Sequence, residues 1–305
     1  MTGARSFRIH LDPASLRRAQ AGGHNFLNKL CEVLAGHGFG PVFLGDGPAE
    51  RLRSAVLPGW SLVHREPPAG ERSLVFRSAC ITPFWQIDRS EKRWEWDVAR
   101  ATFDPERVDR AEAESFARAW RKRLYSGATE GNTSEDFVFV PLQALLTERR
   151  SFQAAAPLEM LEAVLERLAP RPVVATLHPR ARCMQDEIVA LDRLCARYPR
   201  LSVRRLPAPE LLRRCAMVVT ENSAAAFEAL FFRKPALLFA GIDFHHPFAS
   251  VWRDGMDAAF EALAGPGPAY DAYLWWYLQG QSLNAGKPDI KDRIAARLRA
   301  LGVPL

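Results

Sequence analysis

Short apolar runs alternate with helical segments in the second half of the chain, and this alternation constrains the fold most. The runs occupy residues 137–142, 173–177 and 236–240, together with Val218-Val219. Runs this short, each followed by a segment with helical spacing, predict a parallel sheet with crossover helices, which is an α/β fold. Because ligands bind beyond the carboxyl ends of parallel strands, the polar residues that follow these runs are the first candidates for a site.

The composition is that of a soluble globular protein, with 48% hydrophobic and 25% charged residues. A length of 305 residues predicts two domains. The sequence shows neither an apolar stretch of ~18 residues nor a signal-peptide pattern, so we expect a cytoplasmic protein. The five cysteines lack metal-ligand spacing, and we expect reduced thiols with no metal and no cofactor. The formal charge of +6 favours an anionic partner.

A polar, glycine-bearing segment at 127–134 predicts the domain boundary. We therefore expect an N-terminal α/β domain at 1–134, a C-terminal α/β domain at 135–285 and a final helix at 286–305. The strand candidates of the first domain are 7–11, 41–44, 61–64 and 74–77. The final helix has apolar residues at helical spacing, which suits packing back on the first domain: Ile290, Ile294, Leu298 and Leu301.

Three polar residues follow the apolar runs in a pattern that suits a nucleotide. His178 precedes Pro179, which fixes the strand end, so the imidazole can donate a hydrogen bond to a phosphate. Ser223 precedes a helix whose free amides can bind an anion. Glu228 is the one charge in that helix and can accept hydrogen bonds from ribose hydroxyls. The alternatives are a surface histidine, a helix cap, and a structural salt bridge between Glu228 and Lys234.

Two further residues are candidates in weaker contexts. Asp88 lies near Trp85, and a carboxylate beside a large aromatic ring is typical of sugar-binding clefts. The alternative is a loop whose aromatic side chains only pack on the domain. Gln143 closes the run at 137–142 and is expected either to reach into a cleft between the domains or to cap the strand. No serine has a Gly-x-Ser-x-Gly context, which argues against acyl transfer.

The order of these motifs resembles that of the capsule polysaccharide biosynthesis proteins, which include the bacterial β-Kdo transferases. The matching pieces are Val140-Pro141-Leu142-Gln143, Leu177-His178-Pro179, Val218-Val219-Thr220-Glu221-Asn222-Ser223, Glu228-Ala229-Leu230, Lys234-Pro235 and the aromatic segment at 273–284. The resemblance implies a GT-B architecture, in which two Rossmann-like domains with parallel sheets face each other across a cleft. It places the acceptor on the first domain and the nucleotide sugar on the second.

The resemblance also implies which residues bind the donor. His178 would contact the donor phosphate, and Glu228 would bind the ribose. The remaining donor-binding residues would be Gln143, Pro179, Arg180, Asn222, Ser223 and Ala224, with backbone amides around Ser223 holding the phosphate.

The catalytic residues implied for the reaction are His178, Glu148 and Asp88. Glu148 stands near the position where family members carry an aspartate after the Pro-Leu-Gln strand, and this chain departs from that pattern. Asp88 is the expected acceptor-activating base, because of its place beside Trp85.

The implied reaction transfers an acidic, Kdo-like sugar from a CMP-linked donor to a lipid-linked or saccharide acceptor, with inversion and without a metal. Contact with the inner face of an anionic membrane suits the basic charge, and no nucleic-acid-binding module is recognisable. Two alternatives stay open. One is a nucleotide-sugar epimerase of the same architecture, and the other is a non-catalytic polysaccharide-binding or export-complex protein.

Overall fold

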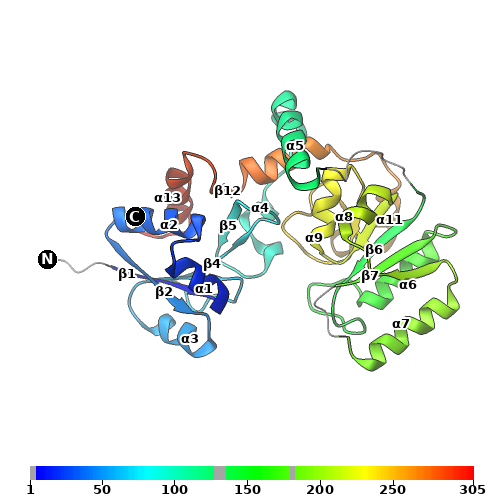
Figure 1. The fold of residues 1–305 in the computed structure, drawn as a ribbon, viewed down its shortest axis with the longest axis horizontal. Helices are drawn as coiled ribbons and strands as arrows, with labels where there is room; N and C mark the ends of the chain where they lie inside the picture. The colour runs from blue at the N-terminus through cyan, green and yellow to red at the C-terminus, as the bar shows by residue number, and fades with distance from the viewer. Residues whose placement is uncertain (1–4, 127–134, 179–182) are drawn as a thin grey trace. The chain divides into compact units, whose positions relative to one another are not determined.

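A computed structural model describes residues 5–126, 135–178 and 183–305 of the chain (Figure 1). Within those residues the strands form two six-stranded sheets, each in its own compact unit. The first unit is Met1–Arg100 together with Tyr277–Leu305, and the second unit is Ala101–Trp276. The second unit is therefore an insertion in the sequence of the first.

The first unit is built on a sheet with the strand order β12-β5-β4-β3-β1-β2. Its strands are β1 (Arg5–Leu11), β2 (Phe39–Gly45), β3 (Trp60–His64), β4 (Ser73–Ser78), β5 (Phe84–Asp88) and β12 (Leu283–Asn284). Strands β1 to β4 pair in parallel, whereas β5 is antiparallel to both β4 and β12. The chain passes from β1 to β2 on one side and then to β3 on the other, which makes the carboxyl ends of β1 and β3 the switch point of this sheet.

The helices of the first unit are α1 (Pro13–Gln20), α2 (Asn25–Gly36), α3 (Pro48–Val56), α4 (Asp97–Arg100) and α13 (Ile290–Ala300). Helix α1 begins where Asp12 accepts hydrogen bonds from the amides of Ala14 and Ser15, both at 3.0 Å. Helices α2 and α13 pack together in the core through Phe26, Leu27, Leu30 and Leu34 of α2, and the apolar face predicted for the final helix is confirmed: Ile290, Ile294, Leu298 and Leu301.

The second unit is built on a parallel sheet with the strand order β11-β10-β9-β6-β7-β8. Its strands are β6 (Val138–Leu142), β7 (Val173–Leu177), β8 (Leu201–Arg204), β9 (Met217–Thr220), β10 (Ala236–Leu238) and β11 (Ala249–Ser250). The apolar runs predicted as strands are β6, β7, β9 and β10, so that prediction is confirmed. Every residue of β6 is buried, as expected for a strand in the middle of a sheet that is covered on both faces.

The helices of the second unit connect these strands and cover the sheet. They are α5 (Arg110–Tyr125), α6 (Pro157–Arg167), α7 (Gln185–Arg197), α8 (Ala208–Arg214), α9 (Ala224–Ala229), α10 (Val251–Asp254), α11 (Met256–Leu263) and α12 (Tyr270–Trp275). A π-helix at Trp276–Gly280 then leads the chain back into the first unit.

The boundaries between the two compact units, at Arg100/Ala101 and Trp276/Tyr277, differ from the domain limits expected at 134 and 285. Helix α5 lies in the second unit because it packs against α12, where Asp271 pairs with Arg121 at 3.3 Å. Residues after Tyr277 lie in the first unit, because Leu283 pairs with Trp85 between β12 and β5. The predicted boundary segment 127–134 lies outside the described residues.

No helix in the described ranges combines the length and the apolar character that a bilayer crossing needs.

Candidate functional site

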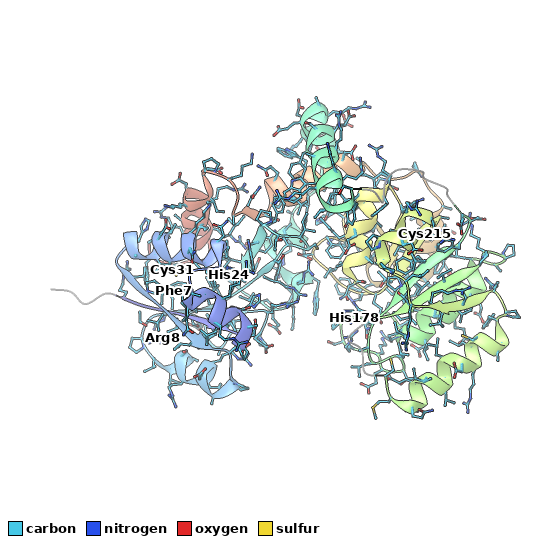
Figure 2. All side chains as sticks on the ribbon, viewed as in Figure 1. Phe7, Arg8, His24, Cys31, His178 and Cys215 are labelled. Atoms are coloured by element: carbon cyan, nitrogen blue, oxygen red, sulfur yellow. The ribbon has the colours of Figure 1, made fainter. Side chains whose placement is uncertain are left out.

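Three adjacent strands of the second sheet, β9, β6 and β7, end at the same edge. The register pairs Leu142 of β6 with Leu177 of β7, so Gln143 and His178 follow two neighbouring strands at the same level. On the other side of β6, Gln143 Nε2 donates a hydrogen bond to Asn222 Oδ1 at 3.0 Å. The sheet thus brings together the predicted residues Gln143, His178 and Asn222. His178 is exposed at the end of β7 (Figure 2).

A polar network behind these residues holds the loop that follows β6. Glu221 is fully buried directly after β9, and its carboxylate accepts hydrogen bonds from Gln153 Nε2 and from Arg150 Nη2, the latter at 3.3 Å. Arg150 Nη2 also donates to Gln143 Oε1 at 3.2 Å, and Arg150 N donates to Gln153 Oε1 at 2.6 Å. Because these contacts link the loop to the ends of β6 and β9, they fix the position of Gln143.

The carboxyl group of Glu221 has an unusual protonation equilibrium. Burial raises the pKa of Glu221 to about 7, although the nearby Arg150 and the hydrogen bond from Gln153 act in the opposite direction. The group therefore changes charge near neutral pH, beside the predicted donor site.

Local sequence patterns indicate no role for Glu221, Arg150 or Gln153. A charged residue directly after a buried strand was a usable signal for Glu221. Its partners lie about 70 positions earlier in a loop, and local spacing does not reveal them.

The predicted anion site at Ser223 begins helix α9. Ser223 Oγ accepts a hydrogen bond from Ala225 N at 3.3 Å, so the serine caps the helix. Ala224 is exposed at the first position of the helix. The helix cap that was the alternative interpretation of Ser223 is therefore present, and phosphate binding there stays a prediction.

Glu228 lies one turn after Ala224 on the same face of α9 and is partly buried. Burial raises the pKa of Glu228, and a hydrogen bond with the Tyr125 side chain opposes this increase. Among the described residues, the side chain that bonds Glu228 is that of Tyr125 rather than that of Lys234. The partner is thus neutral, and the carboxylate keeps acceptor capacity for a ligand.

The remaining predicted residues of the second unit are less informative. Glu148 is exposed in the loop after β6, and its amide donates to Leu145 O at 3.2 Å. No bond joins the Glu148 side chain to the described residues of the strand ends. Pro179 and Arg180 lie outside the described residues.

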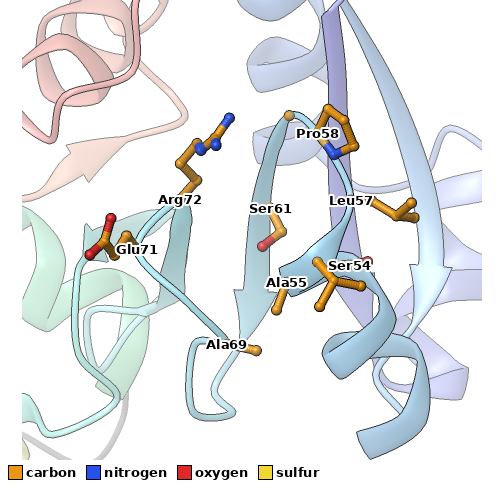
Figure 3. A pocket seen from close by; sticks show the side chains of 10 residues that line it. Ser54, Ala55, Leu57, Pro58, Ser61, Ala69, Glu71 and Arg72 are labelled. Carbon is orange, nitrogen blue, oxygen red and sulfur yellow. The ribbon is translucent and has the colours of Figure 1, made fainter.

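Two surface cavities lie away from the carboxyl edges of the sheets. One of about 360 Å³ in the first unit is lined by Ser54, Ser61 and Arg72 among others, near the start of β3 (Figure 3). The other, in the second unit, is lined by Phe137, Pro172 and Arg204 among others. Neither cavity includes a predicted site residue. No group of three or more His, Cys, Asp or Glu in the described ranges is arranged to hold a metal ion.

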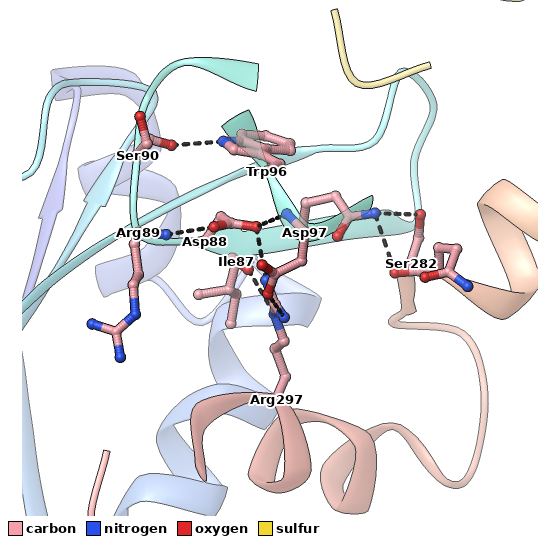
Figure 4. A network of polar contacts seen from close by, with 10 residues as sticks. Ile87, Asp88, Arg89, Ser90, Trp96, Asp97, Ser282 and Arg297 are labelled. Carbon is pink, nitrogen blue, oxygen red and sulfur yellow. Dashed lines mark hydrogen bonds and ion pairs between the residues drawn. The ribbon is translucent and has the colours of Figure 1, made fainter. Parts of the chain in front are cut away.

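Asp88 occupies a different environment from the one expected. It lies in β5, a strand rather than a loop, so its side chain and that of Trp85 point to opposite faces of the sheet. Its carboxylate accepts hydrogen bonds from Arg89 N at 2.8 Å, Asp97 N at 2.9 Å and Arg297 Nη2 at 2.8 Å (Figure 4).

These bonds give Asp88 a structural role. Arg297 is on α13, and it also donates to Ile87 O at 2.8 Å and to Asp97 Oδ2 at 2.6 Å. Burial raises the pKa of Asp88, whereas the two amides and Arg297 lower it. Because three donors already bind its carboxylate and its side chain is buried, this geometry disfavours Asp88 as the acceptor-activating base.

Comparison with known proteins is consistent with the strand-end site. The family model described as capsule polysaccharide biosynthesis protein matches residues 116–252, which include Gln143, His178 and the segment after β9. A comparison with curated protein sequences found no match.

Among solved structures, the β-Kdo 2,7 transferase KpsC of Thermosulfurimonas dismutans resembles this chain with a TM-score of 0.55 and 11% identity, over 98% of this chain and 99% of that one. The β-Kdo 2,4 transferase KpsC of the same organism has a TM-score of 0.48 and 13% identity, over 87% and 88%. A UDP-GlcNAc 2-epimerase of Methanocaldococcus jannaschii has a TM-score of 0.37 and 10% identity, over 97% and 99%. The first comparison, together with the two sheets, confirms the predicted α/β, GT-B-like fold class.

Proposed function

We propose that this protein is a glycosyltransferase that uses a CMP-linked acidic sugar such as Kdo, because the family model of the capsule polysaccharide biosynthesis proteins matches residues 116–252. The observation that carries the proposal is the meeting of Gln143, His178 and Asn222 at one strand edge. This edge is where parallel α/β sheets bind ligands, and it lies within the matched part of the chain. The acceptor is a lipid-linked or other saccharide in the cytoplasm.

In this mechanism, negative charge develops on the phosphate of CMP as it leaves the anomeric carbon. His178 donates a hydrogen bond to that phosphate and stabilises the charge where it forms. Arg180 and the amides around Ser223 and Ala224 assist, while Asn222 and Gln143 line the pocket. Glu228 accepts hydrogen bonds from the ribose hydroxyls. The reaction needs no metal ion under this proposal, since the hydrogen bond from His178 and the guanidinium of Arg180 stabilise the phosphate charge.

The stereochemical proposal is inversion at the anomeric carbon. Proton NMR of the product measures its configuration directly, and a retained configuration would reject this part of the proposal. Glu148 stays a candidate to assist the reaction from its exposed loop, whereas the environment of Asp88 leaves the base to be sought elsewhere.

Nucleotide binding to the whole chain tests the donor proposal. Ligands that bind the native state raise the melting temperature, so CMP should raise it more than UDP or GDP does. A chelator should leave this shift unchanged. His178→Ala should reduce the CMP shift, whereas His37→Ala in the first unit is the matched control. A larger shift with a diphosphate nucleotide would reject the CMP-linked donor.

Contact with an anionic membrane belongs to the same proposal. Helix α3 exposes Leu52 and Val56 one turn apart, to 66% and 83%, with Arg53 between them, and Leu57 follows at 44%. Apolar side chains beside an arginine suit the interface of an anionic bilayer. The double substitution Leu52→Ser/Val56→Ser should lower the fraction of protein that cosediments with anionic phosphatidylglycerol vesicles. The fraction that cosediments with phosphatidylcholine vesicles is the reference. Equal sedimentation of wild type and variant would reject the contact.

A matched control for the vesicle assay lies in the second unit. Val189 and Val203 are exposed to 38% and 37%. Val189→Ser/Val203→Ser also removes two partly exposed apolar side chains, away from α3, and should leave cosedimentation unchanged.

A further inference from the structure

Two histidines meet at the switch point of the first sheet. His64 ends β3, and Asp12 follows β1 directly, so both lie at the carboxyl edge of adjacent strands. His24 precedes α2, and its ring lies 5.1 Å from the ring of Trp85, which lies 6.5 Å from the ring of His64. The base expected in this unit is Asp88, which lies on the opposite face of β5 from Trp85, and the sequence indicated no role for Asp12, His24 or His64.

The hydrogen bonds fix which nitrogen of each imidazole carries a proton. His64 Nδ1 lies 3.3 Å from Asp12 Oδ2, and a carboxylate can only accept, so Nδ1 carries the hydrogen and Nε2 is left with a lone pair. His24 Nδ1 accepts a hydrogen bond from Leu27 N at 3.3 Å, so the hydrogen of the neutral ring is on Nε2. Neither Nε2 atom has a hydrogen-bond partner among the described residues. One ring therefore presents an acceptor and the other a donor.

Both rings are neutral at neutral pH. Burial lowers the pKa of His24 to about 4, with a further decrease from Arg18, and burial lowers the pKa of His64. Arg65 and Arg77 lower the pKa of His64 further, whereas Asp12 raises it. The hydrogen bond from Ser15 is the main cause that lowers the pKa of Asp12 to about 2, so Asp12 is ionised and can orient the His64 ring.

The apolar and charged surroundings indicate the kind of ligand. One face of the Trp85 ring stacks on Phe26 at 5.0 Å, and Trp85 is only partly buried. Such an aromatic platform suits the apolar face of a sugar ring. Arg18 lies at the same turn, where its Nε donates to Gly23 O at 2.9 Å. Arg65 directly follows β3 in a left-handed conformation with φ 67°, a strained conformation of the kind that clusters at functional sites.

We propose that this group, Asp12, His24, His64 and Trp85, binds a hydroxyl of an anionic sugar acceptor, and that His64 Nε2 accepts its proton. The inference rests on the proposed glycosyltransferase function. The hydroxyl oxygen accepts a hydrogen bond from His24 Nε2 and donates its own to His64 Nε2. As this oxygen forms a bond to the anomeric carbon, the bond from that carbon to the leaving oxygen breaks, and the leaving oxygen keeps the electron pair. The proton moves to His64 Nε2 and then to water.

Binding is tested first without any nucleotide. The methyl glycoside of Kdo is titrated into the full-length protein while the imidazole Cε1–H signals are followed by NMR. We expect the signals of His24 and His64 to shift and that of His37 to stay in place, with weaker binding in Trp85→Phe. Methyl glucoside, a neutral control, should bind at least tenfold more weakly. Unmoved His24 and His64 signals at saturating Kdo glycoside would overturn the proposal.

Turnover is tested with His64→Gln and Asp12→Asn. His64→Gln should lower kcat by about 10²- to 10⁴-fold, the usual contribution of a general base, and should leave CMP affinity within twofold of wild type. Asp12→Asn keeps a good cap for α1, since asparagine is favoured there. Its amide donates to His64 Nδ1 and forces the hydrogen onto Nε2, which removes the proton acceptor.

Asp12 is a positioning residue, and the pH profile separates this role from a structural one. Since Asp12 raises the pKa of His64, Asp12→Asn should lower the maximum of kcat/KM at least tenfold and move its acidic limb to lower pH. An unchanged maximum, or a lower melting temperature with an unmoved limb, would overturn the role of Asp12. If CMP fails to bind but the Kdo glycoside shifts both histidines, the donor proposal fails and this inference stands. If CMP binds and the glycoside shifts neither histidine, the donor proposal stands and this inference fails.

Discussion

The buried carboxyl group of Glu221 should make the stability of the second unit depend on pH near neutrality. The pKa of this group is about 7 in the folded chain, against an ordinary value of 4.5 in the unfolded chain. A folded-state pKa that is raised means that the folded protein holds the proton more tightly. Its stabilising contribution is therefore fully present below pH 4.5 and is lost as the pH rises through 7.

The two pKa values set the magnitude of this effect. Between pH 5 and pH 8 the contribution of Glu221 falls by about 2.5 kcal/mol, since each pKa unit corresponds to about 1.4 kcal/mol. Glu221→Gln removes the titration and keeps an acceptor for Gln153. Its amide places N–H groups near Arg150, which adds a cost that does not depend on pH. The informative quantity is therefore how the difference in the free energy of unfolding between variant and wild type changes with pH.

Urea unfolding of both proteins at pH 5, 6, 7 and 8 measures this quantity. We expect the free energy of unfolding of Glu221→Gln to rise relative to wild type by about 2.5 kcal/mol between pH 5 and pH 8. Glu148→Gln, in the exposed part of the loop after β6, is the control and should show a flat difference. A flat difference for Glu221→Gln as well would refute the reasoning that burial holds the proton on this group.

Three further predictions concern other parts of the chain. Arg297→Ala leaves the buried carboxylate of Asp88 without its cation and should lower the free energy of unfolding by about 3–5 kcal/mol. The control Arg299→Ala, on the same helix, should lower it by less than about 1 kcal/mol, and equal losses in urea unfolding would contradict the pairing. Glu228→Gln should weaken CMP binding by about 1–3 kcal/mol in calorimetry with an unchanged melting temperature, and a lower melting temperature with unchanged affinity would show a structural role instead. His178→Ala should lower kcat by about 10²-fold or more with a smaller effect on CMP affinity, and intact turnover would remove His178 from the phosphate site.

Strands β6, β7, β9 and β10 of the second sheet were predictable because each contains a short apolar run, and polar residues follow the runs of β6, β7 and β9. That pattern also gave the neighbours Gln143, His178 and Asn222, since parallel strands bring their carboxyl ends to one edge. The network around Glu221 was not predictable in the same way. Its partners Arg150 and Gln153 are in a loop, where side-chain direction follows no period.

The first unit shows a second limit of local spacing. Side chains alternate between the two faces of a strand, so in β5 Phe84, Gln86 and Asp88 lie on one face and Trp85 on the other. The sequence predicts Asp88 beside Trp85, as in a sugar-binding cleft, but residues three apart in a strand point to opposite faces of the sheet. The cation that holds Asp88 is on α13, 209 positions later in the chain, and no pattern near Asp88 indicates it.

The insertion of Ala101–Trp276 into the first unit has a consequence for synthesis. The second unit is one continuous stretch and can fold as soon as it leaves the ribosome. The first unit cannot, because β12 and α13 complete its sheet and core and are translated after the second unit. At a translation rate of about 5–20 residues per second, the first 100 residues are synthesised on the order of ten seconds or more before those partners. During that interval the apolar face of α2 and the edge of β5 are uncovered. We therefore expect chaperones to bind the N-terminal segment during synthesis.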